Sequence, residues 1–427
     1  MIIKNFDEIA KSEERAFALK LVDVGLEAVE TKKVVRETVV RDGDELRIGN
    51  EKFSLKEIER LFVVGVGKCA LSAGEALEEI LGASISGGTV IDIREGKLNH
   101  IHVIKGDHPF PSEKNVSATE EIIELLSGAT EKDFVIFIIS GGGSTLLCNP
   151  TDMTCLDETL ILKHLYSSAV GIRKINTVRK HLSSARGGYL AKYAYPAKSV
   201  ALIFSDVPGD DLEFIASGPT IKDTTTVEDA EKIIKECDLR AKAGANQVSL
   251  IETPKEDKYF KNIKNILVVS NKIALTAMAE RARAEGFTPE IISTTFEGEA
   301  ENVAVDVVRK MEGVASRTVH LYGGESTVTV RHVGKGGRNL ELALATLELI
   351  KDNELVIAVS SDGRDNTDLA GAISDIITKG NAERLKLSSR EYVDDNRSYD
   401  FFKKTGDYIK TGDTGRNIAD IVIAIKT

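Results

Sequence analysis

The fold is decided by the stretch Phe134-Val-Ile-Phe-Ile-Ile-Ser140-Gly-Gly-Gly-Ser144-Thr145, in which an apolar run ends in three glycines. Six consecutive apolar residues, mostly β-branched or aromatic, predict a strand that is buried on both faces of a parallel sheet. The glycines let the chain turn sharply and leave its backbone open to a ligand. Bare amides beside two hydroxyls, at the start of a helix near Thr145, suit an anion such as phosphate. A tight strand-to-helix turn without a ligand is an equal alternative for this stretch alone.

Length and composition indicate a globular protein of two domains. The 427 residues exceed the size at which one core keeps growing, and 42% of them are hydrophobic and 29% charged. The net charge of -11 argues against nucleic acid or an anionic membrane as a partner, because no basic field would attract a polyanion. We see no signal-peptide pattern and no apolar run of membrane-span length, so we expect a cytoplasmic protein. The absence of CxxC pairs favours reduced thiols over disulfides or zinc for Cys69, Cys148, Cys155 and Cys237.

Apolar segments alternate with helical patterns, which predicts an α/β fold with largely parallel sheets and ligands at the carboxyl ends of the strands. We expect a Rossmann-like N-terminal domain over residues 1–240 and a second α/β domain over 241–427. One helix is expected over Ala118–Leu126, with Ser117 as its cap. The expected strands of the first domain are Leu61–Val64, Gly88–Ile93, Ile101–Ile104, Phe134–Ile139 and Ser199–Phe204. Those of the second are Ile266–Val269, Glu290–Ser293, Thr318–Tyr322, Val356–Val359 and Ile421–Ile425.

The loop after the first expected strand has two interpretations. Its sequence, Gly65-Val-Gly67-Lys68-Cys-Ala70, fits a dinucleotide-binding fingerprint, and Asp92 ends the next strand where a ribose-binding acid belongs. An NAD-dependent oxidoreductase is therefore one alternative. The loop also places the ammonium of Lys68 in the turn, where it could neutralise a phosphate. A Walker A loop is excluded, because Phe62 and Cys69 stand where that motif needs Gly and Ser or Thr.

Basic residues gather in two later segments. The segment from Ile175 to Gly188 contains Arg179, Lys180, His181 and Arg186, and it is either a solvated helix face or an anion-binding surface. The rigid loop Gly106-Asp-His108-Pro-Phe-Pro111 offers a histidine that could be a general base, although a capping role is the more frequent one.

Acidic and glycine-rich loops follow other expected strands. Ser205-Asp206-Val-Pro-Gly-Asp210-Asp211 and Ser360-Ser-Asp362-Gly-Arg364-Asp365-Asn-Thr-Asp368 place carboxylates where Mg²⁺ could be held beside phosphate, although Asp is also a frequent turn residue. Gly323-Gly-Glu325-Ser-Thr327 and Gly334-Lys-Gly-Gly-Arg338-Asn339 form a second glycine-rich pair. An arginine after two glycines resembles one placed to bind an oxyanion.

Taken together, these segments resemble the class II glycerate kinases, a family whose C-terminal part is the MOFRL domain. The matching motifs, in family order, are Ser140-Gly-Gly-Gly-Ser144, Ile175-Asn-Thr-Val-Arg-Lys-His181, Ser205-Asp206-Val with Ala216-Ser-Gly-Pro219, Gly323-Gly-Glu325, Gly336-Gly-Arg-Asn339 and Ser361-Asp362-Gly363. The resemblance implies ATP- and Mg²⁺-dependent phosphorylation of D-glycerate to 2-phosphoglycerate, in a cleft between two α/β domains. The lysine and arginine of the family's active site correspond to Lys68 and Arg338.

The chain departs from the family pattern in its second half. Leu340 replaces a glutamine, the acidic loop lacks a Gly-Pro pair before Thr367, and Arg416 stands where the family has a threonine. These changes put contacts from the second domain in doubt and leave the core chemistry in place.

The resulting hypothesis assigns a role to each candidate residue. Lys68 and the glycine-loop amides would hold phosphate, Arg338 would stabilise the transferring phosphoryl group, and Asp206 would orient the hydroxyl or hold Mg²⁺. Asp362 is a second candidate for Mg²⁺. Substrate and phosphate binding is assigned to Ser140, Gly141, Gly142, Gly143, Ser144, Arg179, Lys180, Glu325 and Asn339, with Arg179 and Lys180 on the glycerate carboxylate. A non-catalytic phosphometabolite sensor remains an alternative, and a homodimer is a candidate assembly.

Overall fold

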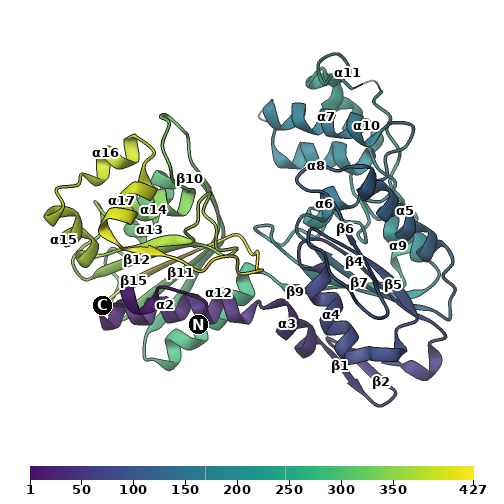
Figure 1. Ribbon diagram of the computed structural model, residues 1–427, viewed down its shortest axis with the longest axis horizontal. Coiled ribbons are helices and arrows are strands. Elements are labelled where there is room, and N and C mark those ends of the chain that lie inside the picture. The colour runs from purple at the N-terminus through teal and green to yellow at the C-terminus, as the bar shows by residue number, and fades with distance from the viewer. Residues whose placement is uncertain (169, 246) are drawn as a thin grey trace. The chain divides into compact units, whose positions relative to one another are not determined.

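The computed structural model describes residues 1–168, 170–245 and 247–427, which form two compact α/β units (Figure 1). The central unit is Thr31–Val269, and the terminal unit combines Met1–Glu30 with Ser270–Thr427. Two α/β units confirm the predicted fold class. Their bounds differ from the predicted 1–240 and 241–427, because the N-terminal segment packs with the second half of the chain and the terminal unit resumes only at Ser270.

Six parallel strands form the sheet of the central unit, in the order β6-β5-β4-β7-β8-β9. This is the Rossmann order, in which the direction of winding reverses between β4 and β7. Both strands are buried along their whole length, because their apolar residues are covered on both faces of the sheet. The strands are β4 (Leu61–Val66), β5 (Gly87–Asp92), β6 (His102–Lys105), β7 (Phe134–Ser140), β8 (Lys198–Phe204) and β9 (Ile263–Val269).

Two expectations for this unit need correction. The apolar run that was expected to open the second domain forms β9, which pairs with β8 and completes the central sheet. Helix α5 (Glu113–Ser127) begins earlier than expected, because Ser112 rather than Ser117 is its cap. The other helices are α3 (Thr31–Thr38), α4 (Ala70–Leu81), α6 (Gly143–Leu146), α7 (Cys155–Ser167), α8 (Ile172–His181), α9 (Tyr189–Ala194), α10 (Val227–Glu236) and α11 (Leu239–Lys242). A small antiparallel sheet contains β1 (Val39–Asp42), β2 (Glu45–Ile48) and β3 (Glu51–Ser54).

The terminal unit has a mixed sheet rather than a largely parallel one, in the order β10-β11-β15-β12-β13-β14. Only β10 and β11 pair in parallel, because β15 inserts antiparallel between β11 and β12 and the remaining pairs are also antiparallel. The strands are β10 (Thr288–Glu299), β11 (Thr318–Thr327), β12 (Glu354–Ser360), β13 (Gly371–Ser374), β14 (Tyr408–Ile409) and β15 (Asp420–Lys426). The helices are α1 (Phe6–Ile9), α2 (Glu13–Ala28), α12 (Asn271–Ala284), α13 (Ala300–Lys310), α14 (Arg338–Thr346), α15 (Ile376–Arg384), α16 (Ser389–Asp394) and α17 (Ser398–Thr405).

A buried arginine explains why the N-terminal segment belongs to the terminal unit. Arg15 of α2 donates from Nε and one amino group to Asp375, both at 2.6 Å, and from the other amino group to Asp407 at 2.7 Å. Its side chain is fully buried. Helix α2 also packs along α12, on one face of the sheet, while α13 and α14 cover the other face (Figure 1). Separating α2 from this unit would leave two carboxylates without their cation.

Candidate active site

The loops after β4 and β7 meet at the switch point of the central sheet. The backbone N–H of Lys68 donates to the carbonyl oxygen of Gly141 at 2.9 Å, and the N–H of Cys69 donates to Ser140 Oγ at 3.3 Å. Gly67 has a φ of 124°, and a Cβ there would overlap the Ser140 hydroxyl. The switch point of an open α/β sheet is where ligands bind in this fold. The structure therefore brings Lys68 to the glycine loop as the sequence predicted.

The glycine loop also touches the acidic loop after β8. A Cβ at Gly141 would overlap the carboxylate of Asp206, so only glycine allows this approach. A Cβ at Gly143 would lie 2.6 Å from the Cβ of Ala216. Helix α6 starts at Gly143, and the first amides of a helix have no acceptor within the helix. These amides, with Ser144, form a backbone surface that suits an anion.

Three basic side chains gather beside this loop. Burial, followed by the charges of Lys68 and Arg179, lowers the pKa of His108, so its imidazole is neutral near pH 7. Arg179 is only 8% exposed. It donates to the Tyr166 hydroxyl at 2.5 Å, while its Nε has no hydrogen-bond partner among the described residues. A guanidinium can bind a carboxylate or phosphate group by two parallel, charge-assisted hydrogen bonds, so Arg179 is a candidate for an anionic group of the substrate.

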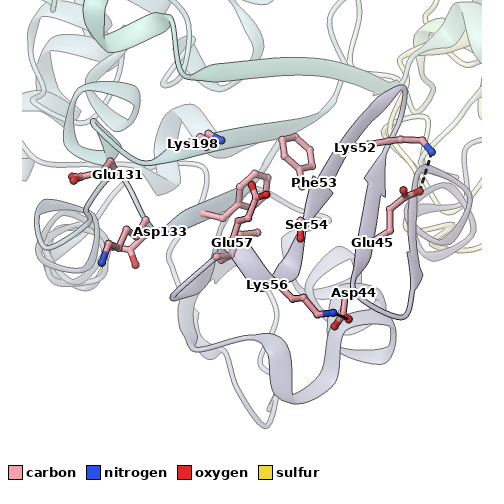
Figure 2. Close-up of a pocket in the computed structure, with 13 residues that line it drawn as sticks. Asp44, Glu45, Lys52, Phe53, Ser54, Lys56, Glu57, Glu131, Asp133 and Lys198 are labelled. Carbon is pink, nitrogen blue, oxygen red and sulfur yellow. Dashed lines mark ion pairs between the residues drawn. The ribbon is translucent and has the colours of Figure 1, made fainter.

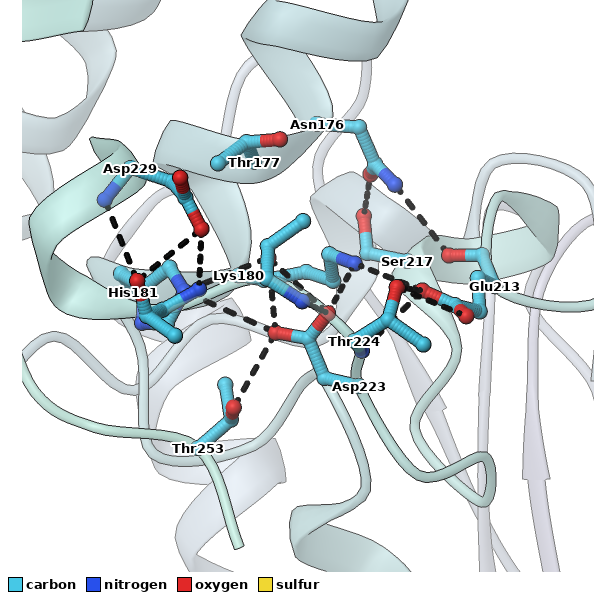
Figure 3. A network of polar contacts seen from close by, with 12 residues as sticks. Asn176, Thr177, Lys180, His181, Glu213, Ser217, Asp223, Thr224, Asp229 and Thr253 are labelled. Atoms are coloured by element: carbon cyan, nitrogen blue, oxygen red, sulfur yellow. Dashed lines mark hydrogen bonds and ion pairs between the residues drawn. The ribbon is translucent and has the colours of Figure 1, made fainter. Parts of the chain in front are cut away.

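The Ser144 hydroxyl is held by a hydrogen-bonded chain through Ser217 and Asn176, two residues that were not predicted as site residues. Ser217 Oγ lies 2.9 Å from Ser144 Oγ and 2.7 Å from Asn176 Oδ1. Asn176 Nδ2 in turn donates to the carbonyl oxygen of Glu213 at 3.2 Å (Figure 3). Ser217 has a positive φ of 60°, an uncommon conformation for serine that points to a constrained loop. Both residues lie in motifs quoted above, but their spacing alone does not show which side chain reaches the site.

Lys180, which the sequence predicts as a ligand of the substrate carboxylate, contacts two carboxylates of the central unit itself. Its ammonium is buried in an ion pair with Asp223 and lies 3.3 Å from Glu213 Oε2 (Figure 3). Burial opposes ionisation of Asp223, but Lys180 and the backbone of Thr225 hold the pKa of this carboxyl below its ordinary value. These contacts engage the Lys180 ammonium within the central unit, so Arg179 is the better candidate for the substrate carboxylate.

In the terminal unit, the predicted residues Glu325, Arg338 and Asn339 come together at one edge of the sheet. Arg338 donates to both carboxylate oxygens of Asp420, at 2.5 and 3.1 Å, and forms an ion pair with Glu325. The pairing register of β15 brings Asp420 to this position, because Asp420 lies opposite Gly324 on β11 and opposite Ser360 on β12. Burial raises the pKa of Asp420 to about 7, and Arg338 works against that rise. The guanidinium has five N–H donors, so some remain for a ligand.

The two predicted metal ligands lie in different units, Asp206 in the central one and Asp362 in the terminal one. Asp362 Oδ1 accepts from the Ser360 hydroxyl at 2.9 Å and from the N–H of Arg364 at 2.8 Å, which is the pattern of a turn. The described residues contain no group of three His, Cys, Asp or Glu side chains placed to hold a metal ion.

Asp92 is not available to a dinucleotide ribose. Its carboxylate is fully buried, and it accepts from the N–H of Leu71 at 2.9 Å and from Arg94 at 3.0 and 3.1 Å. Leu71 lies in the first turn of α4, where the fingerprint would place a pyrophosphate. A carboxylate at that position repels an anion. The structure thus argues against the NAD interpretation of this loop.

A cavity of about 520 Å³ lies at the opposite end of the central strands from the candidate site (Figure 2). Phe134 and Lys198, the first residues of β7 and β8, form part of its wall, with charged residues from the small antiparallel sheet. Two of these charges already pair with neighbours, Lys52 with Glu45 and Lys56 with Asp44. No predicted site residue belongs to the described lining, so the cavity is separate from the candidate site.

The described part of the chain contains no helix long and apolar enough to cross a membrane. All four cysteines are free thiols.

Both units of the chain are similar to known proteins. Residues 17–252 match a family described as a domain of unknown function (DUF4147), and residues 318–420 match the MOFRL family. The glycerate 2-kinase of Pyrococcus horikoshii is 37% identical, with 97% of each chain covered. A putative hydroxypyruvate reductase of Agrobacterium vitis is 38% identical over 85% of this chain and 86% of its own. A crystal structure of the glycerate kinase of Thermotoga maritima superposes with a TM-score of 0.85 at 31% identity, covering 96% of this chain and 99% of that one.

Proposed function

The chain belongs to the glycerate kinase family with a C-terminal MOFRL domain, and from this membership we propose that it phosphorylates D-glycerate with ATP to give 2-phosphoglycerate. One observation carries the proposal beyond family membership: the Lys68 loop is hydrogen-bonded to the glycine loop at the switch point of the sheet. Phosphoryl transfer needs positioning and charge neutralisation more than covalent chemistry. A lysine beside open backbone amides provides both.

In the central unit, the groups divide between phosphate and carboxylate. Lys68 and the amides from Gly141 to Ser144 hold phosphate oxygens, and the Ser217 contact keeps the Ser144 hydroxyl in place. Arg179, which Tyr166 holds by one hydrogen bond, binds the glycerate carboxylate with other donors of its guanidinium. Its burial strengthens that attraction, because a charge pair is screened less inside a protein than in water. Asp206, against the glycine loop, orients the substrate hydroxyl.

In the terminal unit, Arg338 stabilises the negative charge of the transferring phosphoryl group. Asp420 and Glu325 orient its planar fork, and the side chain of the next residue, Asn339, donates a hydrogen bond to Asp365. A pre-oriented guanidinium loses little freedom when it binds an oxyanion. That Lys68 and Arg338 serve one reaction in an interdomain cleft remains a prediction, which parallel loss of turnover in Lys68→Ala and Arg338→Ala tests.

Mg²⁺ is proposed to accompany ATP. This ion often takes only one or two protein carboxylates and completes its shell with phosphate oxygens and waters, so the absence of a three-carboxylate group among the described residues fits such a mode. Asp206 is the carboxylate closest to the glycine loop and would hold the ion there, with Asp362 as the second candidate. When bound, Mg²⁺ neutralises phosphate charge. A cytoplasmic location and a homodimer likewise remain predictions.

A reductase is the alternative that the name of the Agrobacterium vitis relative raises. The buried, fully engaged carboxylate of Asp92 speaks against it, because no acid is left for a dinucleotide ribose. Purified protein is tested with small hydroxy acids, ATP and Mg²⁺ in a coupled assay for ADP, and in parallel with hydroxypyruvate and NADH or NADPH. We expect ADP release that depends on D-glycerate. Oxidation of the nicotinamide without ADP release would favour the reductase, and binding of ATP without turnover of any acid would favour a sensor.

A further inference from the structure

The first turn of α14 is held by a carboxylate that lies 26 residues later in the sequence. Asp365 Oδ1 accepts the backbone N–H of Asn339 at 3.1 Å, and Asp365 Oδ2 accepts that of Leu340 at 2.7 Å. Gly337 occupies the N-cap position of this helix and has no side chain to satisfy these donors. Asp365 therefore does, from another loop, what a capping side chain does locally.

Burial and close backbone contacts fix the position of the Asp365 carboxylate. Asp365 is only 3% exposed, and its own N–H donates to the carbonyl oxygen of Leu369 at 2.8 Å. A Cβ on Gly337 would overlap both the backbone oxygen and the carboxylate of Asp365. The glycine before Arg338 is thus required by the approach of the acidic loop, and the two loops form one packed structure.

The capped turn carries the residues that matter for the proposed reaction. Arg338 is the first residue of α14, and Asn339 also donates from Nδ2 to Asp365 Oδ1 at 3.3 Å. The Arg338 side chain is held at its tip by Asp420 and Glu325, but its backbone is held through the Asp365 cap. A guanidinium that must meet a phosphoryl group needs both ends held, because a shift of about 1 Å can lower turnover roughly a hundredfold.

We propose that Asp365 is a positioning residue of the kinase reaction, which holds the start of α14 so that Arg338 reaches the transferring phosphoryl group. The inference rests on the proposed function. Both carboxylate oxygens of Asp365 accept N–H groups from the start of α14, whereas the Mg²⁺ candidate of the same acidic loop is Asp362. Arg338 acts on the charge that develops in the transition state, so loss of its positioning by Asp365 should lower turnover more than substrate affinity.

The test compares Asp365→Asn and Asp365→Ala with Ser388→Ala. Ser388 caps α16 in the same unit by accepting the N–H of Glu391 at 3.4 Å, so its variant loses a cap of the same kind away from the site. We expect the Asp365 variants to lose roughly tenfold to a hundredfold in kcat, with KM for D-glycerate and ATP changed less than about threefold. Ser388→Ala should keep the kcat of the parent. Equal kcat in Asp365→Asn and the parent, with folding checked by circular dichroism, would overturn the inference.

A double-variant cycle separates positioning from general stability. If Asp365 acts through Arg338, then Asp365→Asn in an Arg338→Ala background should lower kcat by less than about twofold more. A full, multiplicative loss would show that Asp365 acts elsewhere. Should the Asp365 variants not fold, Gly337→Ala displaces the cap sterically and is expected to lower kcat in the same way; a folded Gly337→Ala with parental kcat overturns the inference. An Arg338→Ala enzyme as active as the parent would instead reject the proposed function of Arg338 itself.

Discussion

The carboxylate of Asp206 lies so close to the Cα of Gly141 that a Cβ on residue 141 would overlap it. These residues lie in the loops that follow the neighbouring parallel strands β7 and β8, and the contact joins the glycine loop to the acidic loop. Glycine is needed here for space rather than for an unusual backbone angle. The loop is therefore sensitive to the addition of one methyl group.

Gly141→Ala should abolish most of the ATP- and glycerate-dependent turnover, because the new Cβ must displace either Asp206 or the loop amides. The matched control is Gly380→Ala in α15, where a Cβ would meet no atom within 4 Å. That variant should keep its turnover and gain about 0.5–1 kcal/mol in stability, since alanine is the better helix former. Steady-state kinetics of both variants make the comparison. Parental activity in a folded Gly141→Ala protein would show that the contact with Asp206 has no role in the reaction.

Arg338→Lys should fold but lose turnover on the order of a thousandfold, because lysine keeps the charge and loses the planar fork. The KM values for both substrates should change far less, since the arginine acts mainly as charge develops in the transition state. Measured kcat and KM decide between two roles. A raised KM for glycerate with nearly unchanged kcat would mean that Arg338 tethers the ground-state substrate instead.

Lys180→Met should destabilise the central unit by about 3–5 kcal/mol, because it leaves Asp223 as a buried charge without its cation. Lys174→Met on the same helix is the control. Lys174 forms an exposed ion pair with Glu236 at 2.7 Å, and such pairs contribute only about 0–1 kcal/mol. Thermal and urea unfolding followed by circular dichroism measure both. Equal stability of the two variants would contradict the structural role of Lys180.

Glu341→Gln should change how the stability of the terminal unit depends on pH. Burial raises the pKa of Glu341 to about 7, from an ordinary value of 4.5, while Asn396 donates a hydrogen bond to the carboxyl group at 3.2 Å. The folded state therefore binds this proton more tightly than the unfolded state does. The stabilisation is complete below pH 4.5 and is lost as the pH rises to about 7. The melting temperature of the parent should fall across this window more steeply than that of Glu341→Gln; parallel curves would contradict the assignment.

The sequence predicted the elements of the central site better than their surroundings. The run from Phe134 to Ile139 was expected as a buried strand, and β7 covers it, because a long β-branched apolar run has few other stable conformations. The glycines and Lys68 could also be predicted from local sequence, because they directly follow such buried strands. The pattern of apolar residues indicates that a strand is buried, but it does not indicate which strand it pairs with. The strand β9 was therefore assigned to the second domain, whereas it pairs with β8 in the central sheet.

Long-range polar pairs were beyond the reach of local patterns. Lys180 looked like a substrate ligand because its partner Asp223 lies 43 residues away and no spacing rule connects them. Asp420 and Asp365 were missed for a similar reason, since their roles depend on the register of β15 and on the packing of the acidic loop. In the terminal unit, the sequence indicated Arg338 and Glu325 but not Asp420, the second carboxylate that holds the guanidinium.

Phosphorus-31 NMR of the reaction products tests the central proposal most directly. Protein, ATP, Mg²⁺ and D-glycerate are incubated, and the position of the transferred phosphate is determined for the parent and for Lys68→Ala, whose lysine has been removed from the glycine loop. The account predicts stoichiometric ADP and 2-phosphoglycerate from the parent and a large loss of both in Lys68→Ala. An unchanged mixture from the folded parent, or equal product from Lys68→Ala, would contradict it.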